Sequence, residues 1–400
     1  MAETKKATKR LNPYVYVVIM ILFFMCWGNM QYRIQPILTY LMRDMGIDTA
    51  KGGLLTSSIN ILGIFLTIPL GVVMNKIGPR KIGILAVVAL LIGSLIGTFS
   101  TASFPMMMVS QIIVGLGGIG VSIACPYVIA CIFEPEMRGK ANGAYIMAGT
   151  LSQLLMYNLI PRIVSGGENL APAWWFCNAW CVVMLIVWIV TITDEIAPPV
   201  GEDGKKGPSL IDTLKALGDT RILRIFLSGM FMMGSAIAVL GLTPTYLVAT
   251  KGMEVADASS LVSGAALVGA ICSLVGGWLS DTLHTRKWLF VFCFAWMALS
   301  RVMIAYLPAG ALLNITIYLQ GIPSITMGLL YTAGSDVIEK ENYAMCSAAL
   351  NTGTKIGSFF GATIFGIIAA SSMGWPGAYI VFAVISLIPL FLMVSLKGLK

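Results

Sequence analysis

Gly71-Val-Val-Met-Asn-Lys-Ile-Gly-Pro-Arg-Lys81 is matched, 206 residues further along the chain, by Gly277-Trp-Leu-Ser-Asp-Thr-Leu-His-Thr-Arg-Lys287. In both segments a glycine near the end of an apolar run is followed by a polar loop that ends in a basic pair. Other positions match at the same offset, but Leu and Gly coincidences are common in an apolar chain. A basic pair at a fixed distance from a glycine is much harder to explain by chance, so the sequence predicts two related halves.

The composition around these segments defines the class of protein. The chain is 58% hydrophobic and 11% charged, with a mean hydropathy of +0.87, which is typical of an integral membrane protein. A basic cluster precedes the first apolar run, as in a signal peptide, but no small-residue cleavage site follows, so we expect an uncleaved helix. The eight cysteines lie in or beside apolar segments and are expected to be core residues, with no disulfide framework and no metal site.

Apolar stretches recur along the whole chain and predict twelve membrane-spanning helices. The predicted spans are 15–42, 53–75, 82–102, 105–132, 140–164, 173–193, 222–248, 259–280, 287–307, 311–335, 344–370 and 376–396. Nineteen of the 26 Lys and Arg residues fall on the side of the termini, four on the opposite side and three inside spans. The positive-inside rule therefore predicts cytoplasmic termini in a multi-pass protein of the cytoplasmic (inner or plasma) membrane.

A polar segment rich in Gly and Pro divides the chain near its middle, as expected for a linker between two units. The predicted organisation is an N-terminal six-helix bundle over 1–194, a cytoplasmic linker over 195–220 and a C-terminal six-helix bundle over 221–400. Two six-helix halves joined in this way are typical of transporters whose substrate site lies between the halves near the middle of the membrane.

Three cations, Arg33, Arg301 and Lys355, lie inside predicted spans, whereas every acidic residue lies in a loop or at a helix end. A charge in hydrocarbon costs roughly 2.5–3.5 kcal/mol, so such residues usually face a cavity. The alternative, which involves no function, is that a long basic side chain near a helix end extends to the membrane–water interface.

The paired segments of the opening paragraph resemble the loop 2–3 signature of the major facilitator superfamily, and the resemblance extends over the full length. It implies an all-α membrane fold of twelve helices in two pseudo-symmetric six-helix bundles. It also implies a cytoplasmic latch made of Gly71, Asn75, Arg80, Lys81, Gly277, Asp281, Arg286 and Lys287. Asn75 replaces the family's acid in the first copy, so that copy is expected to lack its ionic component, and His284 replaces the second glycine in the second copy.

In this family helices 1, 4, 7 and 10 line the central cavity, and helices 2, 5, 8 and 11 flank it. That placement implies that Arg33 and Lys355 face the cavity, whereas Arg301, near the outer end of helix 9, is expected to reach the interface. Weaker candidates on the inner helices share helical faces with these cations or with one another, although polar residues also pack membrane helices together without binding anything. These candidates for substrate binding are Trp27, Asn29, Tyr32, Tyr145, Gln153, Gln320, Tyr331 and Asn351.

Short motifs around Tyr32–Pro36 and Met45–Ile47 and the lysine of helix 11 resemble the organic-anion branches of the superfamily: anion:cation symporters, cyanate-type permeases and oxalate:formate antiporters. Independently, two cavity cations without a carboxylate favour an anionic ligand, and arginine offers a fork that fits a carboxylate. The sequence thus predicts alternating-access transport of a small organic anion, a mono- or dicarboxylate, with anion exchange favoured.

Several alternatives stay open at this point. One is a proton-coupled symporter of a monocarboxylate, and another is a drug:proton antiporter, which normally carries an intramembrane acid. An enzyme is not expected, because the single histidine is in a loop and no nucleophile–base or metal-ligand cluster is visible. No cofactor is expected. The expected partners are the anionic substrate, the lipid bilayer and, in the symport reading, protons, with no nucleic acid and a monomeric state.

Overall fold

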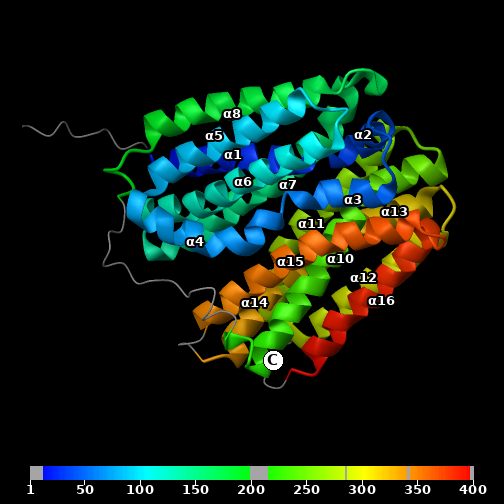
Figure 1. Ribbon diagram of the computed structural model, residues 1–400. Coiled ribbons are helices and arrows are strands. Elements are labelled where there is room, and N and C mark those ends of the chain that lie inside the picture. The colour runs from blue at the N-terminus through cyan, green and yellow to red at the C-terminus, as the bar shows by residue number, and fades with distance from the viewer. Residues whose placement is uncertain (1–11, 199–214, 284–285, 340–342, 397–400) are drawn as a thin grey trace, which may run out of the picture.

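The structure is a computed structural model that describes residues 12–198, 215–283, 286–339 and 343–396, and within these ranges it is helical, without strands. Figure 1 shows helices that run roughly alongside one another in two groups. The first group contains α1 (Pro13–Tyr32), α2 (Leu38–Met45), α3 (Thr49–Ser58), α4 (Ile61–Ile77), α5 (Pro79–Thr98), α6 (Phe104–Ile132), α7 (Pro135–Ile163) and α8 (Ala171–Thr191).

The second group repeats this plan in the other half of the chain. It contains α10 (Thr220–Lys251), α11 (Val255–Leu283), α12 (Arg286–Tyr306), α13 (Ala311–Leu319), α14 (Ile325–Val337), α15 (Tyr343–Ala370) and α16 (Gly374–Val394), with short 3₁₀ turns η1 (Gln35–Ile37), η2 (Ser165–Gly167) and η3 (Ile322–Ser324) at breaks and loops.

Within the described residues, eleven helical stretches are long and apolar enough to cross a membrane. The predicted span at 140–164 is also a helix, α7, whose sequence is more polar, and it packs along α1 and α11 as a further crossing. The prediction of twelve spanning helices in an all-α membrane fold is thereby confirmed. The predicted domain limits at 194/195 and 220/221 stay predictions, because part of the linker, 199–214, lies outside the described residues.

Three spans that were predicted as continuous helices are interrupted. The first breaks after Tyr32 and resumes at Leu38, because Pro36 has no N–H to continue the helical hydrogen bonds. The second breaks at Ile59-Asn60, and the tenth breaks between Leu319 and Ile325, at a segment that contains Gly321 and Pro323. Hydropathy reports the length of an apolar run, not the continuity of its backbone, so these breaks were missed.

Equivalent helices are paired in the two halves, which confirms the predicted pseudo-symmetry. In the first bundle α1 packs on α7, α4 on α6 and α5 on α8; in the second, the equivalent pairs are α10 with α15, α11 with α13 and α14, and α12 with α16. Each equivalent pair joins helices that occupy the same positions in the two repeats. The repeat seen in the sequence therefore corresponds to a repeat in helix packing.

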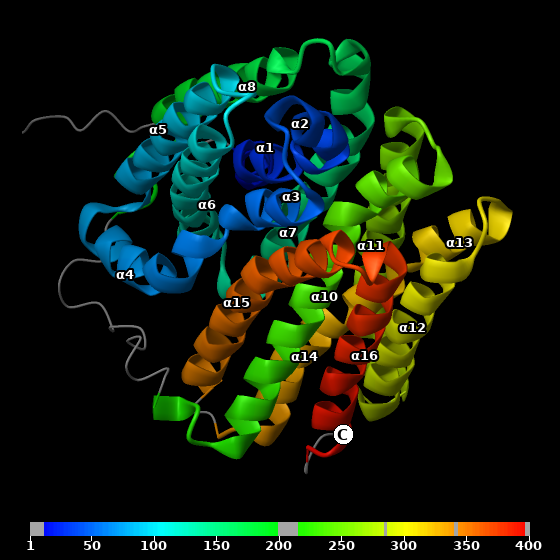
Figure 2. The same cartoon turned by 45° about the vertical axis from the view of Figure 1, so that its right-hand side comes forward.

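The two bundles meet at one end of the molecule and diverge toward the other (Figures 1 and 2). We call the end where α1 begins and α16 ends the terminal face. At the opposite face α3 packs on α15 and α7 packs on α11. Backbones touch there, since a Cβ added to Gly53 would lie 2.3 Å from the Ala362 carbonyl oxygen and one added to Gly366 would lie 2.5 Å from that of Thr49. The opposite face is therefore closed.

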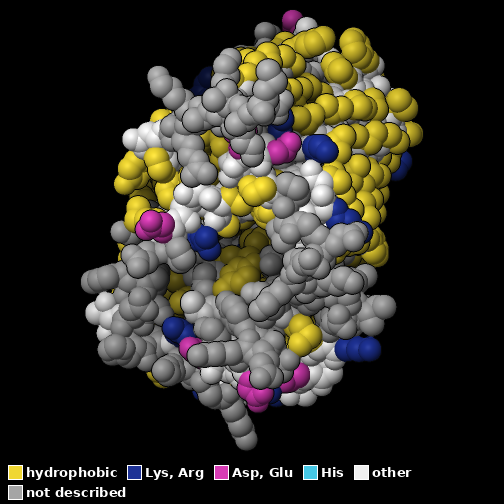
Figure 3. Space-filling view, turned by 90° about the vertical axis from the view of Figure 1, so that its left-hand side faces the viewer, with side chains coloured by type: hydrophobic (Ala, Val, Ile, Leu, Met, Phe, Trp, Pro, Cys, Tyr) yellow, Lys and Arg dark blue, Asp and Glu magenta, His cyan; other side chains and the backbone are white. Residues whose placement is uncertain are grey.

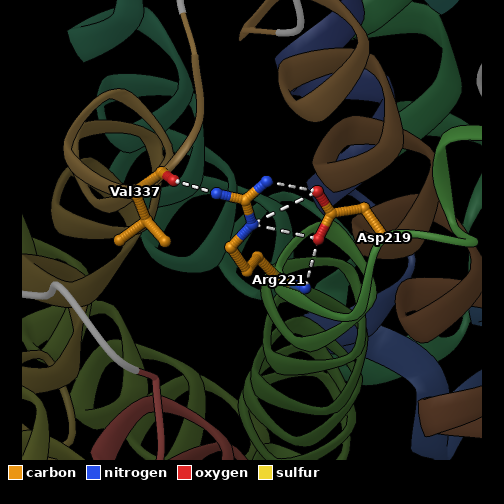
Figure 4. A network of polar contacts seen from close by, with 3 residues as sticks. All are labelled: Asp219, Arg221 and Val337. Carbon is orange, nitrogen blue, oxygen red and sulfur yellow. Dashed lines mark hydrogen bonds and ion pairs between the residues drawn. The ribbon is translucent and has the colours of Figure 1, made fainter.

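At the terminal face, charged side chains tie the helix ends of the second bundle together (Figure 4). Asp219 caps α10, and the Arg221 guanidinium donates to its carboxylate at 2.7 Å and to the Val337 carbonyl, at the end of α14, at 3.0 Å. The hydrogen bonds from Arg221 hold the pKa of the Asp219 carboxyl below its usual range. Arg286 also forms an ion pair with Asp336, which joins the start of α12 to the same end of α14.

Candidate functional site

A cavity of about 520 Å³ lies between the bundles, on the second-bundle side of their interface. Its walls come from α7 of the first bundle and from α10, α11, α12 and the α13–α14 break of the second. Viewed onto the terminal face, the molecule is hollowed near its centre, with apolar side chains at the bottom of the recess (Figure 3). A cavity of this size can enclose a small-molecule ligand.

Arg301 on α12 lines this cavity. Its side chain is 3% exposed, its Nη1 group donates to the Met297 carbonyl one turn earlier, and its Nε group has no hydrogen-bond partner among the described residues. No ion pair of Arg301 with an acidic residue occurs in the described part of the chain. A buried guanidinium without counter-charge is strongly unfavourable, and it gives this wall of the cavity a net positive charge. The expectation that Arg301 reaches the interface is wrong: α12 turns this residue inward.

The broken tenth span brings further polar groups next to Arg301. Gln320, Gly321, Pro323 and Ser324 lie on the cavity wall, and the buried Gln320 Nε2 donor has no partner among the described residues. The break occurs where α11 and the tenth span approach closely, since a Cβ on Gly321 would lie 2.3 Å from the Ala265 carbonyl oxygen. It sets the carboxyl-terminal end of α13 and the amino-terminal end of α14 together beside the cavity, so the partial charges of the two helix ends oppose each other there.

The remaining walls are mostly apolar and contain few hydrogen-bonding side chains. The polar residues there include Thr150 and Gln153 on α7. The apolar lining includes the methionines Met147, Met232, Met233, Met297 and Met327. Unbranched methionine side chains adapt to ligands of different shape. The cavity thus combines one unpaired cation and one free amide donor with a deformable apolar wall.

Two of the residues predicted to bind substrate, Gln153 and Gln320, line the cavity. Arg33 does not line it. The Arg33 side chain is fully buried inside the first bundle, where Nη1 donates to Ser94 Oγ on α5 at 2.6 Å and the guanidinium lies 4.9 Å from the ring centroid of Trp174 on α8. The expectation that Arg33 faces the cavity therefore fails: its position along the chain predicted its depth in the membrane, but Arg33 lies on the face of α1 that packs on α5 and α8. Its assignment to substrate binding stays a prediction.

Other candidates on α1 and α7 take part in packing. Trp27 fills the space beside Gly118 on α6, where an added Cβ would lie 2.1 Å from the indole ring. Tyr32 packs edge-to-face with Tyr157, at 6.4 Å between ring centroids, and Tyr145 packs in the same way with Phe24, at 5.5 Å. Asn29 is fully buried in the first bundle. None of these side chains lines the described cavity.

Lys355, Tyr331 and Asn351 lie outside the cavity lining. Lys355 on α15 is half-buried against α4, since a Cβ on Gly63 would lie 3.4 Å from Lys355 Cδ, so it sits at the seam between the bundles. Tyr331 donates to the Asn351 side-chain oxygen at 2.7 Å and links α14 to α15. Their roles in substrate binding stay predictions.

The latch residues of the two halves lie at the terminal face. Arg80 approaches Asp194 at 3.9 Å, and this exposed pair joins α5 to the segment after α8; Arg286 pairs with Asp336 as described above. Asn75 is half-buried at the end of α4, Lys81 and Lys287 are exposed, and Gly71 has open space beside it. The side chain of Asp281, the surroundings of Gly277, and His284 lie outside the described residues. Each observed ion pair joins helices of one bundle.

Restoring the family's acid with Asn75→Asp is expected to favour closure of the terminal face by up to about fivefold, the range of one exposed ion pair. A cysteine introduced at Met327, a cavity position reached from that face, should then react more slowly with an impermeant thiol reagent. The measurement uses a background in which the exposed Cys131 is replaced, with Asn75→Ala as the uncharged control. Equal labelling rates in both variants would reject a role for this position in closure.

Comparison with known proteins gives a consistent result. The sequence matches the family model described as Major Facilitator Superfamily over residues 16–282 and 225–398. It is 24% identical over 314 residues to the probable nitrate/nitrite transporter NarK2 of Mycobacterium tuberculosis, covering 77% of this chain and 72% of that protein. It is 24% identical over 323 residues to the nitrite extrusion protein of Bacillus subtilis, covering 79% and 75%.

The same fold occurs in a solved structure of the nucleoside transporter NupG. The TM-score is 0.77 at 14% identity, with 98% of this chain and 100% of that chain covered. The chain belongs to the major facilitator superfamily. It is a multi-pass membrane transporter and not an enzyme, as predicted.

Proposed function

We propose that the protein is a secondary transporter that moves a small planar oxyanion by alternating access. The observation that carries this proposal is the buried, unpaired Arg301 guanidinium on the cavity wall, beside the free Gln320 amide donor. A guanidinium presents parallel donors to two oxygens of a planar anion, and in a site screened from water such a charge-assisted pair is strong.

Nitrate, nitrite and a carboxylate all present two oxygens in a plane. The names of the relatives favour nitrate or nitrite, whereas the apolar methionine wall favours a monocarboxylate with an apolar portion. A drug:proton antiporter is not supported, because no acidic side chain lines the described cavity. For each of these candidate substrates the proposal is the same: the protein transports an anion whose oxyanion group binds at Arg301 and Gln320.

The cavity is hollowed toward the terminal face and the opposite face is closed. Nineteen of the 26 basic residues belong to the terminal side in the predicted topology, which favours cytoplasmic termini in the cytoplasmic membrane. With that orientation the structure corresponds to an inward-facing carrier. The polar seam of the opposite face, which includes Asn158 Nδ2 bonded to Ser263 Oγ at 2.9 Å, would then separate in the outward-facing state.

We propose anion exchange as the mode of transport, with proton-linked symport as the alternative. Arg33 is already buried in this structure, so closing the cavity in the empty carrier would not bury it further. Lys355 is half-buried between the bundles, and we propose that closing the cavity would bury it completely. Complete burial of Lys355 in the empty carrier would cost roughly 2.5–3.5 kcal/mol and slow the return step about 100-fold. A bound anion offsets that cost.

Exchange predicts that labelled anion leaves proteoliposomes far faster with external anion than without it. Lys355→Gln removes the charge that would be buried, so it should raise the rate of net efflux by up to about 100-fold. The rate of net efflux should then approach the rate of exchange without exceeding it. Equal efflux rates in the two conditions for the unmodified protein would reject exchange. Stimulation of net efflux by a pH gradient alone would support the symport alternative.

The proposed function itself is tested by uptake of a panel of labelled solutes into proteoliposomes preloaded with the same solute. Nitrate, nitrite and short monocarboxylates should include a transported solute, whereas a neutral sugar, a nucleoside and a zwitterionic amino acid should not be taken up. Uptake of neutral solutes, with no uptake of any oxyanion, would reject the proposal.

A further inference from the structure

Arg33 forms part of a second polar region, inside the first bundle and separate from the cavity at Arg301. Its Nε and Nη2 groups, which together form one edge of the guanidinium, are buried without a hydrogen-bond partner among the described residues. This is the edge with which Arg221 donates to both carboxylate oxygens of Asp219 elsewhere in the molecule. Arg33 thus keeps an unused pair of parallel donors in a water-excluded place.

Unpartnered polar atoms collect on the helices around Arg33. Asn29, one turn earlier on the same face of α1, is fully buried and has no partner for either side-chain atom in the described structure. On α8, Trp174 Nε1 and Asn178 Oδ1 are also without partners, and the Trp174 ring lies against the Arg33 guanidinium. Gln111 Oε1 on α6 is a further such atom.

The level of Gln111 follows from helix geometry. Gly118 on α6 contacts Trp27 on α1, and α1 and α6 run in opposite directions. Because the two helices are antiparallel, moving seven residues back along α6 from Gly118 goes in the same direction as moving seven residues forward along α1 from Trp27. Each move covers roughly 10 Å. Gln111, which lies on the same side of α6 as Gly118, therefore sits at the level of Arg33 and Ile34. We call Asn29, Arg33, Gln111, Trp174 and Asn178 the Arg33 cluster.

We propose that the Arg33 cluster binds a small inorganic anion of halide size, distinct from the transported anion. A buried cation needs a counter-charge, and the elements around Arg33 supply Ser94, the Trp174 ring and the thiol of Cys177, but no carboxylate among the described residues. Unpaired buried polar atoms in a folded protein usually mark a bound water or ion, and a net positive charge favours an anion.

The tight packing around the cluster limits the size of this anion. A Cβ on Gly97 would lie 2.4 Å from Trp174 Nε1 and 2.7 Å from Ser110 Oγ. Ser94 accepts a hydrogen bond from Arg33, and Ser110 donates one to the Gly93 carbonyl, so both hydroxyls are held in place beside the cluster. A monoatomic ion fits such a setting better than a carboxylate with an organic body. The bound ion would hold α1, α5, α6 and α8 together as a unit through the transport cycle.

The test compares thermal unfolding of the purified full-length protein in sodium chloride and in the sodium salt of Hepes, a bulky anion without a carboxylate, at equal ionic strength. Chloride should raise the midpoint temperature of unfolding by a few degrees, because a ligand that binds only the folded state stabilises it. Arg33→Gln should remove the chloride effect, and Arg301→Gln, the matched control in the other bundle, should retain it. Absence of a chloride effect in the unmodified protein, or its persistence in Arg33→Gln, would overturn the proposal.

Two further results would distinguish anion binding at the Arg33 cluster from anion binding in the transport cavity. If chloride stabilisation is lost only in Arg301→Gln, the ion binds in the transport cavity and the Arg33 proposal fails, while the proposed function stands. If Arg33→Gln does not fold, crystals of the unmodified protein grown with sodium bromide decide the matter. An anomalous peak at hydrogen-bonding distance from Arg33 Nε and Nη2 supports the site, and its absence there rejects it.

Discussion

Arg301→Gln is expected to lower the rate of anion uptake by about 30-fold or more, with the folded protein retained in the membrane. The substitution keeps a polar side chain on the cavity wall but removes the charge and the paired donors that hold the oxyanion. Loss of one partner from a desolvated charge pair typically costs about 2–5 kcal/mol. Initial uptake into proteoliposomes, normalised to the amount of reconstituted protein, measures the effect.

Arg301→Lys is expected to recover little of this loss, because a single ammonium cannot replace a planar fork. Arg43→Gln is the matched control: it removes an exposed cation at the opposite face, where Arg43 donates to the Gly167 carbonyl at 2.8 Å. The control should transport at close to the unmodified rate. Unimpaired uptake by Arg301→Gln would remove the basis of the proposed site.

The second large effect is expected from Gly366→Val. Even a Cβ at this position would lie 2.5 Å from the Thr49 carbonyl oxygen and 3.2 Å from the Gly53 Cα. The side chain would meet backbone that cannot move aside without separating α3 from α15. We therefore expect the variant to lose closure of the opposite face, and with it most transport activity.

Gly328→Val is the matched control, because nothing lies within 4 Å of a Cβ added to that α14 residue. A cysteine introduced at Ser263, which is buried in the α7–α11 seam, reports on the opposite face. Its labelling by an impermeant thiol reagent added from that side should rise about fivefold or more in Gly366→Val, since overpacking typically costs 1–3 kcal/mol. Equal labelling in Gly366→Val and Gly328→Val would contradict the assignment of α3 and α15 to the closed gate.

The sequence was sufficient for the architecture, because hydropathy and the repeat depend on composition and spacing. The paired segments ending at Lys81 and Lys287 located the two halves correctly, and the predicted spans overlap the helices of the structure. The breaks near Pro36 and Pro323 were not foreseen, although both contain a proline that could have signalled them. A proline within a membrane helix is often tolerated, so the presence of a proline alone does not predict that the helix is interrupted.

The site was harder to predict, because it depends on the direction in which each side chain points. Position along a helix placed Arg33 and Arg301 in the membrane but did not show which neighbours they face. Arg33 caps the end of α1 and points toward α5 and α8, whereas Arg301 lies within α12, which presents it to the cavity. Of the two candidates named on the tenth span, Gln320 lines the cavity and Tyr331 does not.

Direct binding tests the central claim without the complication of the transport cycle. Nitrate, nitrite and short monocarboxylates are titrated into the purified protein by calorimetry, in Hepes buffer without added carboxylate or chloride, with Arg301→Gln and Gln320→Leu measured alongside. The account predicts saturable binding of at least one oxyanion, an affinity at least about 30-fold lower in Arg301→Gln, and a smaller loss in Gln320→Leu. Equal affinity in Arg301→Gln and the unmodified protein would contradict it.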